Sequence, residues 1–283
     1  MNEKGVKMQR NNKKRVTSLI LTFSLVLGLL GTLTALKAGG KNSADSLNVL
    51  QKWYSEYSQT GNTGDDINPD ADGIVRQQRT YYLGNTVWVV QGVKNKRLVC
   101  ARVSIGYRAY KVFHGNRANG FVTVAHAVKD SSDNYLYRTS GRTDQVGRIE
   151  AWRYDSYADV SFISVNSQKN TISTKTAGGV TISPTIKTVK AGDKVSTCGG
   201  VSGTVNNKIV YDASKSATVD GLYMTDLIRT ACMSKAGDSG APVYYKNGSK
   251  YLLVGIIVGG DLRDYTFVEK AANLKSRFGV TPY

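Results

Sequence analysis

One serine of the chain lies between two glycines, in the stretch Ala236-Gly237-Asp238-Ser239-Gly240-Ala241-Pro242. A serine hydroxyl becomes a nucleophile only when a base takes its proton and N–H donors stabilise the oxyanion that it creates. Gly237 permits a sharp turn, so that the amides of Gly237 and Ser239 could supply those donors. A glycine-rich hairpin turn is the alternative interpretation of this stretch. The choice depends on whether a base and a carboxylate occur elsewhere.

The chain contains two histidines, so the search for a base is short. His126 follows the β-branched run 120–125, at the end of a predicted strand, where an imidazole can face a cleft. His114 lies among polar residues at 113–116, which predict a solvent-exposed hairpin loop. His126 is therefore the candidate base.

The partner of the imidazole should be a buried carboxylate, because it must orient the ring and stabilise its charged form without being hydrated. Asp159 fits, since it opens the apolar run 159–163. Asp155 has polar neighbours and is interpreted as a loop residue. We therefore prefer Asp159 as the third member of the site.

The order His, Asp, Ser along the chain is that of chymotrypsin-fold proteases. The blocks 123–127, 158–163 and 237–242 resemble the three signature blocks of chymotrypsin-like serine proteases. Their compact spacing and the segment 266–280 are similar to the bacterial branch that includes streptogrisins and α-lytic protease, over about residues 89 to 280. The resemblance implies a serine endopeptidase that needs no cofactor. Its catalytic residues would be His126, Asp159 and Ser239, with the Gly237 and Ser239 amides as the oxyanion hole.

The resemblance also implies a substrate-binding segment, Val258-Gly259-Gly260, on which relatives dock the substrate as an added strand. Val258 stands where relatives often have a serine, so one hydrogen bond near Asp159 is lost. Protein or peptide substrates are the expected partners.

Met233 and Ser234 lie near the expected base of the primary pocket, which argues against a trypsin-like acidic floor and favours an apolar side chain. Asp261 and Asp264 follow the Gly259-Gly260 wall and are the alternative source of a carboxylate in the pocket. A glutamate-specific enzyme usually has a pocket histidine, which argues against that specificity here.

The resemblance also has implications for maturation and for disulfides. Residues 89–92 look like the mature start of the family, so cleavage before Val89 would free an ammonium group to pair with Asp238. Cys100 lacks its usual partner, because Ala127 follows the candidate base. Cys198 and Cys232 could form a bridge, a question that the sequence leaves open.

From about residue 86 the sequence is rich in Val, Ile, Thr and Tyr, with Gly, Asn and Ser turns, which predicts an all-β architecture of two six-stranded antiparallel β-barrels and a short C-terminal helix. Asn206-Asn207 and Asn247-Gly248 are predicted hairpin tips. The strands are expected near 98–105, 107–113, 120–125, 145–152, 159–165, 180–189, 194–198, 203–211, 222–230, 241–246 and 250–258. The barrels would span 86–185 and 186–283, with the cleft between them.

The N-terminus indicates export. Basic residues precede 16–36, a stretch without charge, which is typical of a signal peptide or an N-terminal membrane anchor over residues 1–38. Residues 39–85 are predicted to form a pro-segment or linker with a helix near 43–57, making the protein a zymogen. Either way we expect the body to be extracellular, secreted or tethered to the outer face of the cytoplasmic membrane.

The acidic stretch 66–75 has Asn68, Asp70 and Asp72 at alternate positions, as in a calcium loop. Arg79 stands where a bidentate glutamate should close such a loop, so an acidic linker is the preferred interpretation. No Cys and His spacing indicates zinc, and we expect no metal.

The formal net charge of +17 is not confined to the N-terminus, because residues 80–283 carry 27 Lys and Arg against 14 Asp and Glu. Such a surface favours electrostatic association with an anionic cell surface, but no basic run with interleaved aromatics indicates a specific nucleic acid. We expect a monomer. Two alternatives remain: a catalytically inactive homologue acting as an extracellular binding module with a basic surface, and a membrane-tethered quality-control protease.

Overall fold

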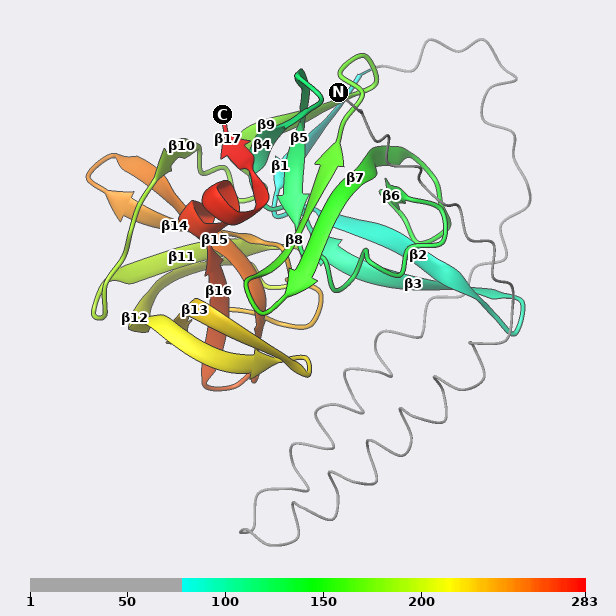
Figure 1. Cartoon of the computed structure of the whole chain (residues 1–283). Coiled ribbons are helices and arrows are strands. Elements are labelled where there is room, and N and C mark those ends of the chain that lie inside the picture. Colours follow the sequence, from blue (N-terminus) through cyan, green and yellow to red (C-terminus); the bar gives the residue numbers. More distant parts are fainter. Residues whose placement is uncertain (1–77) are drawn as a thin grey trace, which may run out of the picture. The chain divides into compact units, whose positions relative to one another are not determined.

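A computed structural model describes residues 78–283. They form an eight-stranded sheet, a seven-stranded sheet and a separate pair of strands, with one short helical segment near the C-terminus (Figure 1). The predicted all-β class and short C-terminal helix are confirmed. The predicted leader, the helix near 43–57 and the acidic stretch 66–75 lie outside the described residues. Between residues 78 and 283, no helix has the length and apolar character needed to cross a membrane.

The first sheet has the order β17-β4-β5-β8-β7-β6-β2-β3. Its strands are β2 (Thr86–Lys94), β3 (Arg97–Ser104), β4 (Arg108–Phe113), β5 (Asn116–Thr123), β6 (Tyr135–Tyr137), β7 (Gln145–Asp155), β8 (Ala158–Ser164) and β17 (Val280–Pro282). Beyond β3 the chain turns to β5, where Gly106 N donates to Val122 O and Val122 N to Tyr107 O, at 2.9 and 3.1 Å. The segment that follows β3, the last strand of this order, thus pairs with β5 near the opposite end of the sheet.

The second sheet has the order β10-β15-β14-β11-β12-β13-β16, and β15 also pairs with β16, so that six of its strands close a ring. Its strands are β10 (Ile182–Ile186), β11 (Lys194–Gly199), β12 (Gly203–Val219), β13 (Leu222–Ala231), β14 (Pro242–Asn247), β15 (Lys250–Gly260) and β16 (Tyr265–Lys270). Separately, β1 (Arg79–Leu83) pairs in parallel with β9 (Asn170–Thr176). Residues 79–83 therefore belong to this packed body, although the sequence places them in the linker.

One of the two predicted hairpin tips is confirmed. Gly248 lies between β14 and β15 and has a φ of 59°. The tip predicted at Asn206-Asn207 is wrong, because β12 continues through both residues and the turn from β11 lies at 200–202. The register between β11 and β12 shifts opposite this point, and Asn207 has a φ of 56°. A local irregularity inside a strand thus produced the turn signal.

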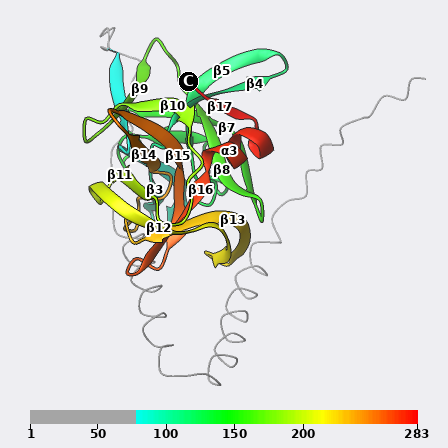
Figure 2. The same ribbon diagram turned by 90° about the vertical axis from the view of Figure 1, so that its left-hand side faces the viewer.

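The C-terminal segment returns from the second sheet to the first. After β16 come α3 (Ala271–Asn273), one π-helical turn η1 (Leu274–Phe278) and then β17, which pairs with β4. The red segment η1 lies against β8 and β17 in both views (Figures 1 and 2). Buried side chains of both sheets, including Phe121, Phe162 and Leu227, form one apolar cluster, which fixes the sheets against each other.

Candidate active site

His126 and Asp159 form a buried pair at the ends of β5 and β8. Asp159 is 1% exposed, and its Oδ2 lies 2.6 Å from His126 Nδ1. The other oxygen, Oδ1, accepts the backbone amides of Ala125 and His126, at 2.7 and 2.8 Å. Three donors therefore fix this carboxylate, and the fixed carboxylate orients the ring through Nδ1.

The pKa of His126 is raised above its ordinary value. Burial of the ring lowers this pKa, but the negative charge of Asp159 and its hydrogen bond to the ring outweigh that effect. Lys129 lowers the pKa by a smaller amount. The other ring nitrogen, Nε2, is buried and has no hydrogen-bond partner within residues 78–283. The imidazole of His126 is therefore a stronger base than an ordinary histidine, and its Nε2 atom makes no hydrogen bond within residues 78–283.

The loop that carries Ser239 packs against the ends of β3 and β5. Ser104 N donates to Ser239 O at 2.8 Å, and Ser239 is 5% exposed. Gly240 has a φ of 88°, and a Cβ added there would lie 2.1 Å from Thr123 Oγ1. Only glycine permits this contact, because a side chain at 240 would clash with Thr123. The serine loop therefore lies against Thr123, which precedes His126 by three residues in the chain. In the described part of the chain, Ser239 Oγ makes no hydrogen bond to His126 Nε2.

Gly237 turns the same loop, with a φ of 94°. The amides of Gly237 and Ser239 donate to no acceptor among the described residues, so both are available to an external oxygen. Arg102, which the sequence interpretation missed, supports the turn: its Nη2 donates to Ala236 O at 3.1 Å, and its guanidinium lies beside Gly237. This geometry can stabilise an oxyanion.

Asp238 orders the loop without any ammonium group. Its carboxylate accepts the amides of Val201, Ser202 and Lys235 at 2.8, 3.1 and 2.8 Å, together with the Ser202 hydroxyl. In the intact chain Val89 is fully buried in the middle of β2, and none of the donors to Asp238 comes from it. The pairing of Asp238 with a new N-terminus at Val89 concerns a cut chain and stays a prediction. The turn that follows β11 supplies three of these donors, and the Lys235 amide of the serine loop supplies the fourth.

Residues 258–260 form the end of β15. The pairing of β14 with β15 ends at Pro242 and Ile256, whereas the pairing with β16 continues to Gly260. Ile257 still bonds on this side, because its N donates to Ala241 O and its O accepts Gly240 N, at 3.0 and 2.8 Å. Beyond Ile257, therefore, one edge of β15 has no partner strand among residues 78–283. Val258 is buried, while Gly259 and Gly260 are partly exposed. An extended peptide could pair with this edge.

Met233 and Ser234 are both buried and share one partner, Thr266. Met233 N donates to Thr266 Oγ1 at 3.0 Å, and the Ser234 and Thr266 hydroxyls lie 2.8 Å apart. Asp261, the alternative source of a pocket carboxylate, uses Oδ1 to accept three amides of its own loop, those of residues 263, 264 and 265. The Met233 side chain packs in an apolar cluster with Val195 and Ile228, whereas the Ser234 hydroxyl contacts the neutral Thr266 hydroxyl.

Glu269 is a buried carboxyl group that the sequence interpretation missed. It is 2% exposed, and its Oε2 accepts the Asp159 amide at 2.9 Å, while Oε1 has no partner among the described residues. Burial raises the pKa of Glu269 to about 8. A lone acidic residue after the apolar run 266–268 was the available signal. The side chain supports Asp159 although Val258 offers no hydroxyl.

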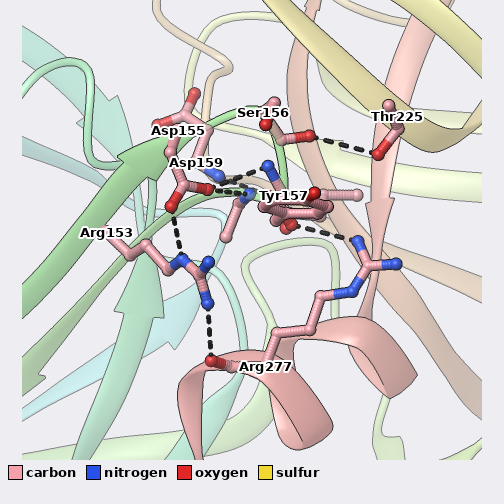
Figure 3. A network of polar contacts seen from close by, with 9 residues as sticks. Arg153, Asp155, Ser156, Tyr157, Asp159, Thr225 and Arg277 are labelled. Atoms are coloured by element: carbon pink, nitrogen blue, oxygen red, sulfur yellow. Dashed lines mark hydrogen bonds and ion pairs between the residues drawn. The ribbon is translucent and has the colours of Figure 1, made fainter.

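The turn before Asp159 is held by a polar network shown in Figure 3. Arg153 Nε donates to Asp155 Oδ2 at 2.7 Å, and Arg153 Nη1 donates to Arg277 O at 2.9 Å. Asp155 Oδ1 also accepts the Tyr157 amide at 2.8 Å, and Arg277 Nη1 donates back to Tyr157 O. The C-terminal turn η1 thereby fixes the hairpin that presents Asp159.

The three cysteines, Cys100, Cys198 and Cys232, are free thiols, so Cys198 and Cys232 do not form the bridge that the sequence left open. His114 is exposed at the tip between β4 and β5, as predicted. Across residues 78–283, no group of three His, Cys, Asp or Glu side chains is placed to hold a metal ion.

No family model and no curated protein matches this sequence. Solved structures do match. Thermobifida fusca protease A is 21% identical with a TM-score of 0.54, over 72% of this chain and 98% of that chain. The α-lytic protease homologue N4 is 20% identical with a TM-score of 0.54, over 71% and 98%. A glutamic acid specific serine protease that uses a histidine triad in substrate binding is 18% identical with a TM-score of 0.55, over 72% and 100%. The chain has the fold of bacterial chymotrypsin-like serine proteases.

Proposed function

We propose that this chain is a serine endopeptidase with Ser239 as nucleophile, His126 as general base and Asp159 as the residue that orients the base. The observation that carries the proposal is the buried 2.6 Å contact between His126 Nδ1 and Asp159 Oδ2, beside a glycine-flanked serine whose neighbouring amides are unengaged. The two sheets would be the two barrels of such an enzyme, with the site between them.

In this proposal, Ser239 Oγ attacks the carbonyl carbon of a peptide bond while His126 Nε2 takes the hydroxyl proton. The amides of Gly237 and Ser239 bind the tetrahedral oxyanion, and each such donor contributes about 3 to 4 kcal/mol. His126 then gives the proton to the leaving amine, and water hydrolyses the acyl-enzyme by the same route in reverse. A rotation of the Ser239 side chain is needed first, since catalytic hydrogen bonds often form only with substrate bound.

The substrate would pair with the open edge of β15 at 258–260, and its primary side chain would enter the pocket that includes Met233 and Ser234. The neutral Ser234 and Thr266 hydroxyls support an uncharged side chain there. The glutamate specificity of one structural neighbour does not carry over by the same means, because this chain has two histidines in all and a histidine triad needs three. The basic start and the uncharged stretch 16–36 support export, and we place the body outside the cytoplasmic membrane.

The proposal is tested by labelling the protein with a fluorophosphonate and locating the adduct by mass spectrometry. We expect modification at Ser239, none in Ser239→Ala, and strong loss in His126→Ala, with circular dichroism unchanged in both variants. Hydrolysis of a peptide library by the parent provides the second readout. Comparable hydrolysis in either variant would refute the assignment.

The alternative, an inactive homologue that acts as a binding module, is favoured by one observation: His126 Nε2 is buried and makes no hydrogen bond to the serine hydroxyl. The same labelling separates the two functions. An inactive homologue leaves Ser239 unmodified even at high reagent concentration.

A further inference from the structure

The hairpin of β12 and β13 extends from the second sheet to the candidate site. Its tip is Asp220-Gly221, with φ values of 48° and 80°, as required for the two central residues of a type I′ turn. Nearer its base, the amide and hydroxyl of Thr225 both donate to Ser156 O, at 3.0 and 3.2 Å (Figure 3). Ser156 lies three residues before Asp159, so this hairpin is fixed beside the pair of catalytic candidates.

The tip borders the open edge of β15. Val219, the last residue of β12, is 6% exposed, and a Cβ added to Gly259 would lie 2.5 Å from Val219 Cγ1. The valine methyl group therefore occupies the space directly above Gly259. Because Gly259 belongs to the segment on which an extended peptide could dock, the hairpin tip forms one wall of that groove.

Asp220 follows Val219 and places a carboxylate at this wall. Its charge raises the pKa of His126, so the carboxylate lies within electrostatic reach of the imidazole. The protein atoms packed around the carboxyl group raise the pKa of Asp220, the His126 charge lowers it, and Asp159 raises it. Lys129 is the cation that faces the same ring, and its ammonium pairs with Asp130.

Asp220 has no hydrogen-bond or ion-pair partner in the described part of the chain, although 27 Lys and Arg stand against 14 Asp and Glu over residues 80–283. Asp220 is an exposed residue at the hairpin tip, so a cation from outside the chain can reach its carboxylate and form a charge-assisted hydrogen bond. The distant lysines and arginines do not oppose this, because salt screens charges beyond about 8 to 10 Å.

We propose that Asp220 is a specificity-determining residue that binds a lysine or arginine side chain of the substrate, at a position upstream of the scissile bond. The proposal rests on the proposed endopeptidase function and adds a substrate class to it: polypeptides with a basic residue before the cleaved bond. We place the basic residue upstream of the scissile bond because, in the proposed binding mode, the residues that precede this bond pair with the edge at 258–260. Val219 and Asp220 border that edge.

The test is a peptide library in which each position upstream of the cleaved bond is lysine, norleucine or glutamate. We expect the parent to prefer lysine at one upstream position by roughly threefold to tenfold, between the effect of an exposed ion pair and that of a charge-assisted hydrogen bond. Asp220→Asn should abolish the preference, and Asp220→Lys should reverse it towards glutamate. The preference should also shrink in about 1 M salt.

Asp212→Asn is the matched control, because it removes the same charge from the same hairpin, and its carboxylate bonds only to the Ser214 amide in the described chain. It should keep the preference of the parent. Equal loss of kcat/KM for lysine and norleucine peptides in Asp220→Asn would overturn the proposal. It would mean that Asp220 acts on His126 and does not bind the substrate side chain. A parent without any charge preference would overturn it as well.

Binding of the same peptides to Ser239→Ala, measured by fluorescence anisotropy, separates this proposal from the function on which it rests. If the parent is labelled at Ser239 but Ser239→Ala binds lysine and norleucine peptides equally, only the role of Asp220 is refuted. If the parent resists labelling but Ser239→Ala prefers lysine peptides and loses that preference when Asp220→Asn is added, only the peptidase function is refuted.

Discussion

Replacing Glu269 by glutamine should change how the stability of this protein depends on pH. The side chain is almost fully buried, and one of its oxygens accepts the Asp159 amide at 2.9 Å, while the other has no partner in the described chain. Burial disfavours the charged form and raises the pKa of Glu269 from 4.5 to about 8. The group is therefore protonated in the folded protein at neutral pH and ionised in the unfolded chain.

The sign follows from proton binding. Between pH 4.5 and about 8 the folded protein keeps a proton that the unfolded chain has lost, so the free energy of unfolding falls as pH rises. The slope approaches 1.4 kcal/mol per pH unit, so that the carboxyl group costs about 2 to 3 kcal/mol between roughly pH 5 and pH 7. Below about pH 4.5 both states are protonated and this cost is absent.

Glutamine keeps an acceptor oxygen for the Asp159 amide but cannot ionise. The assay is denaturant unfolding from about pH 5 to pH 8, in a Ser239→Ala background that prevents self-digestion. We expect the unfolding free energy of Glu269→Gln minus that of its parent to increase by about 2 to 3 kcal/mol as the pH rises from roughly 5 to 7. Glu150→Gln is the control, because Glu150 is exposed and accepts only the Ser164 hydroxyl in the described chain. A stability difference that does not vary with pH would refute the reasoning.

Three further outcomes follow from the site. The kcat/KM profile should lose activity on the acid side with a midpoint above 6.5, because the pKa of His126 is raised and only the neutral ring accepts a proton; a midpoint below 6.5 would contradict this. Asp226→Asn should cost about 1 kcal/mol in unfolding free energy at neutral pH, because the Lys270 ammonium loses its partner. That cost, measured by denaturant unfolding, should disappear as the pH falls through the pKa of Asp226, about 2. A cost that persists in acid would contradict the role of the Asp226 charge. Gly240→Ala should abolish fluorophosphonate labelling and lower the melting temperature, because its Cβ would overlap Thr123 Oγ1, and normal labelling would mean that the loop can move away.

Much of the fold could be predicted because many strands are short runs rich in Val, Ile, Thr and Tyr that end at Gly, Asn or Ser turns. Strict alternation was not the signal, since strands such as β8 and β11 are buried along nearly their whole length. All eleven predicted strand segments overlap observed strands, but β1, β2, β6, β9, β16 and β17 were missed. β6 and β17 have three residues each, too few to show a period. β1 and β9 are polar at their surface positions and pair only with each other, so their strand character comes from a contact between residues about ninety apart.

The candidate site, like the fold, has parts that the sequence could predict and parts that it could not. His126, Asp159 and Ser239 could be proposed from short local patterns, because each stands at a strand end or in a glycine turn. Their supports could not, since the Asp159 amide bonds to Glu269, 110 residues later, and Arg102 Nη2 bonds to Ala236, 134 residues later. Local spacing carries no information about which strands meet.

The relation between the serine loop and the His126–Asp159 pair is fixed by contacts between the sheets. Ser104 N holds Ser239 O from β3, Thr123 of β5 touches Gly240, and Glu269 of β16 holds the Asp159 amide. These contacts come from three strands and leave little freedom for the loop to approach or leave the imidazole as a body. A rotation of χ1 moves the Ser239 hydroxyl while every backbone contact stays in place, so we expect the bond between Ser239 Oγ and His126 Nε2 to form by a change of side-chain rotamer. Substrate binding at the β15 edge, where the hairpin tip borders the groove, is the event that would select that rotamer.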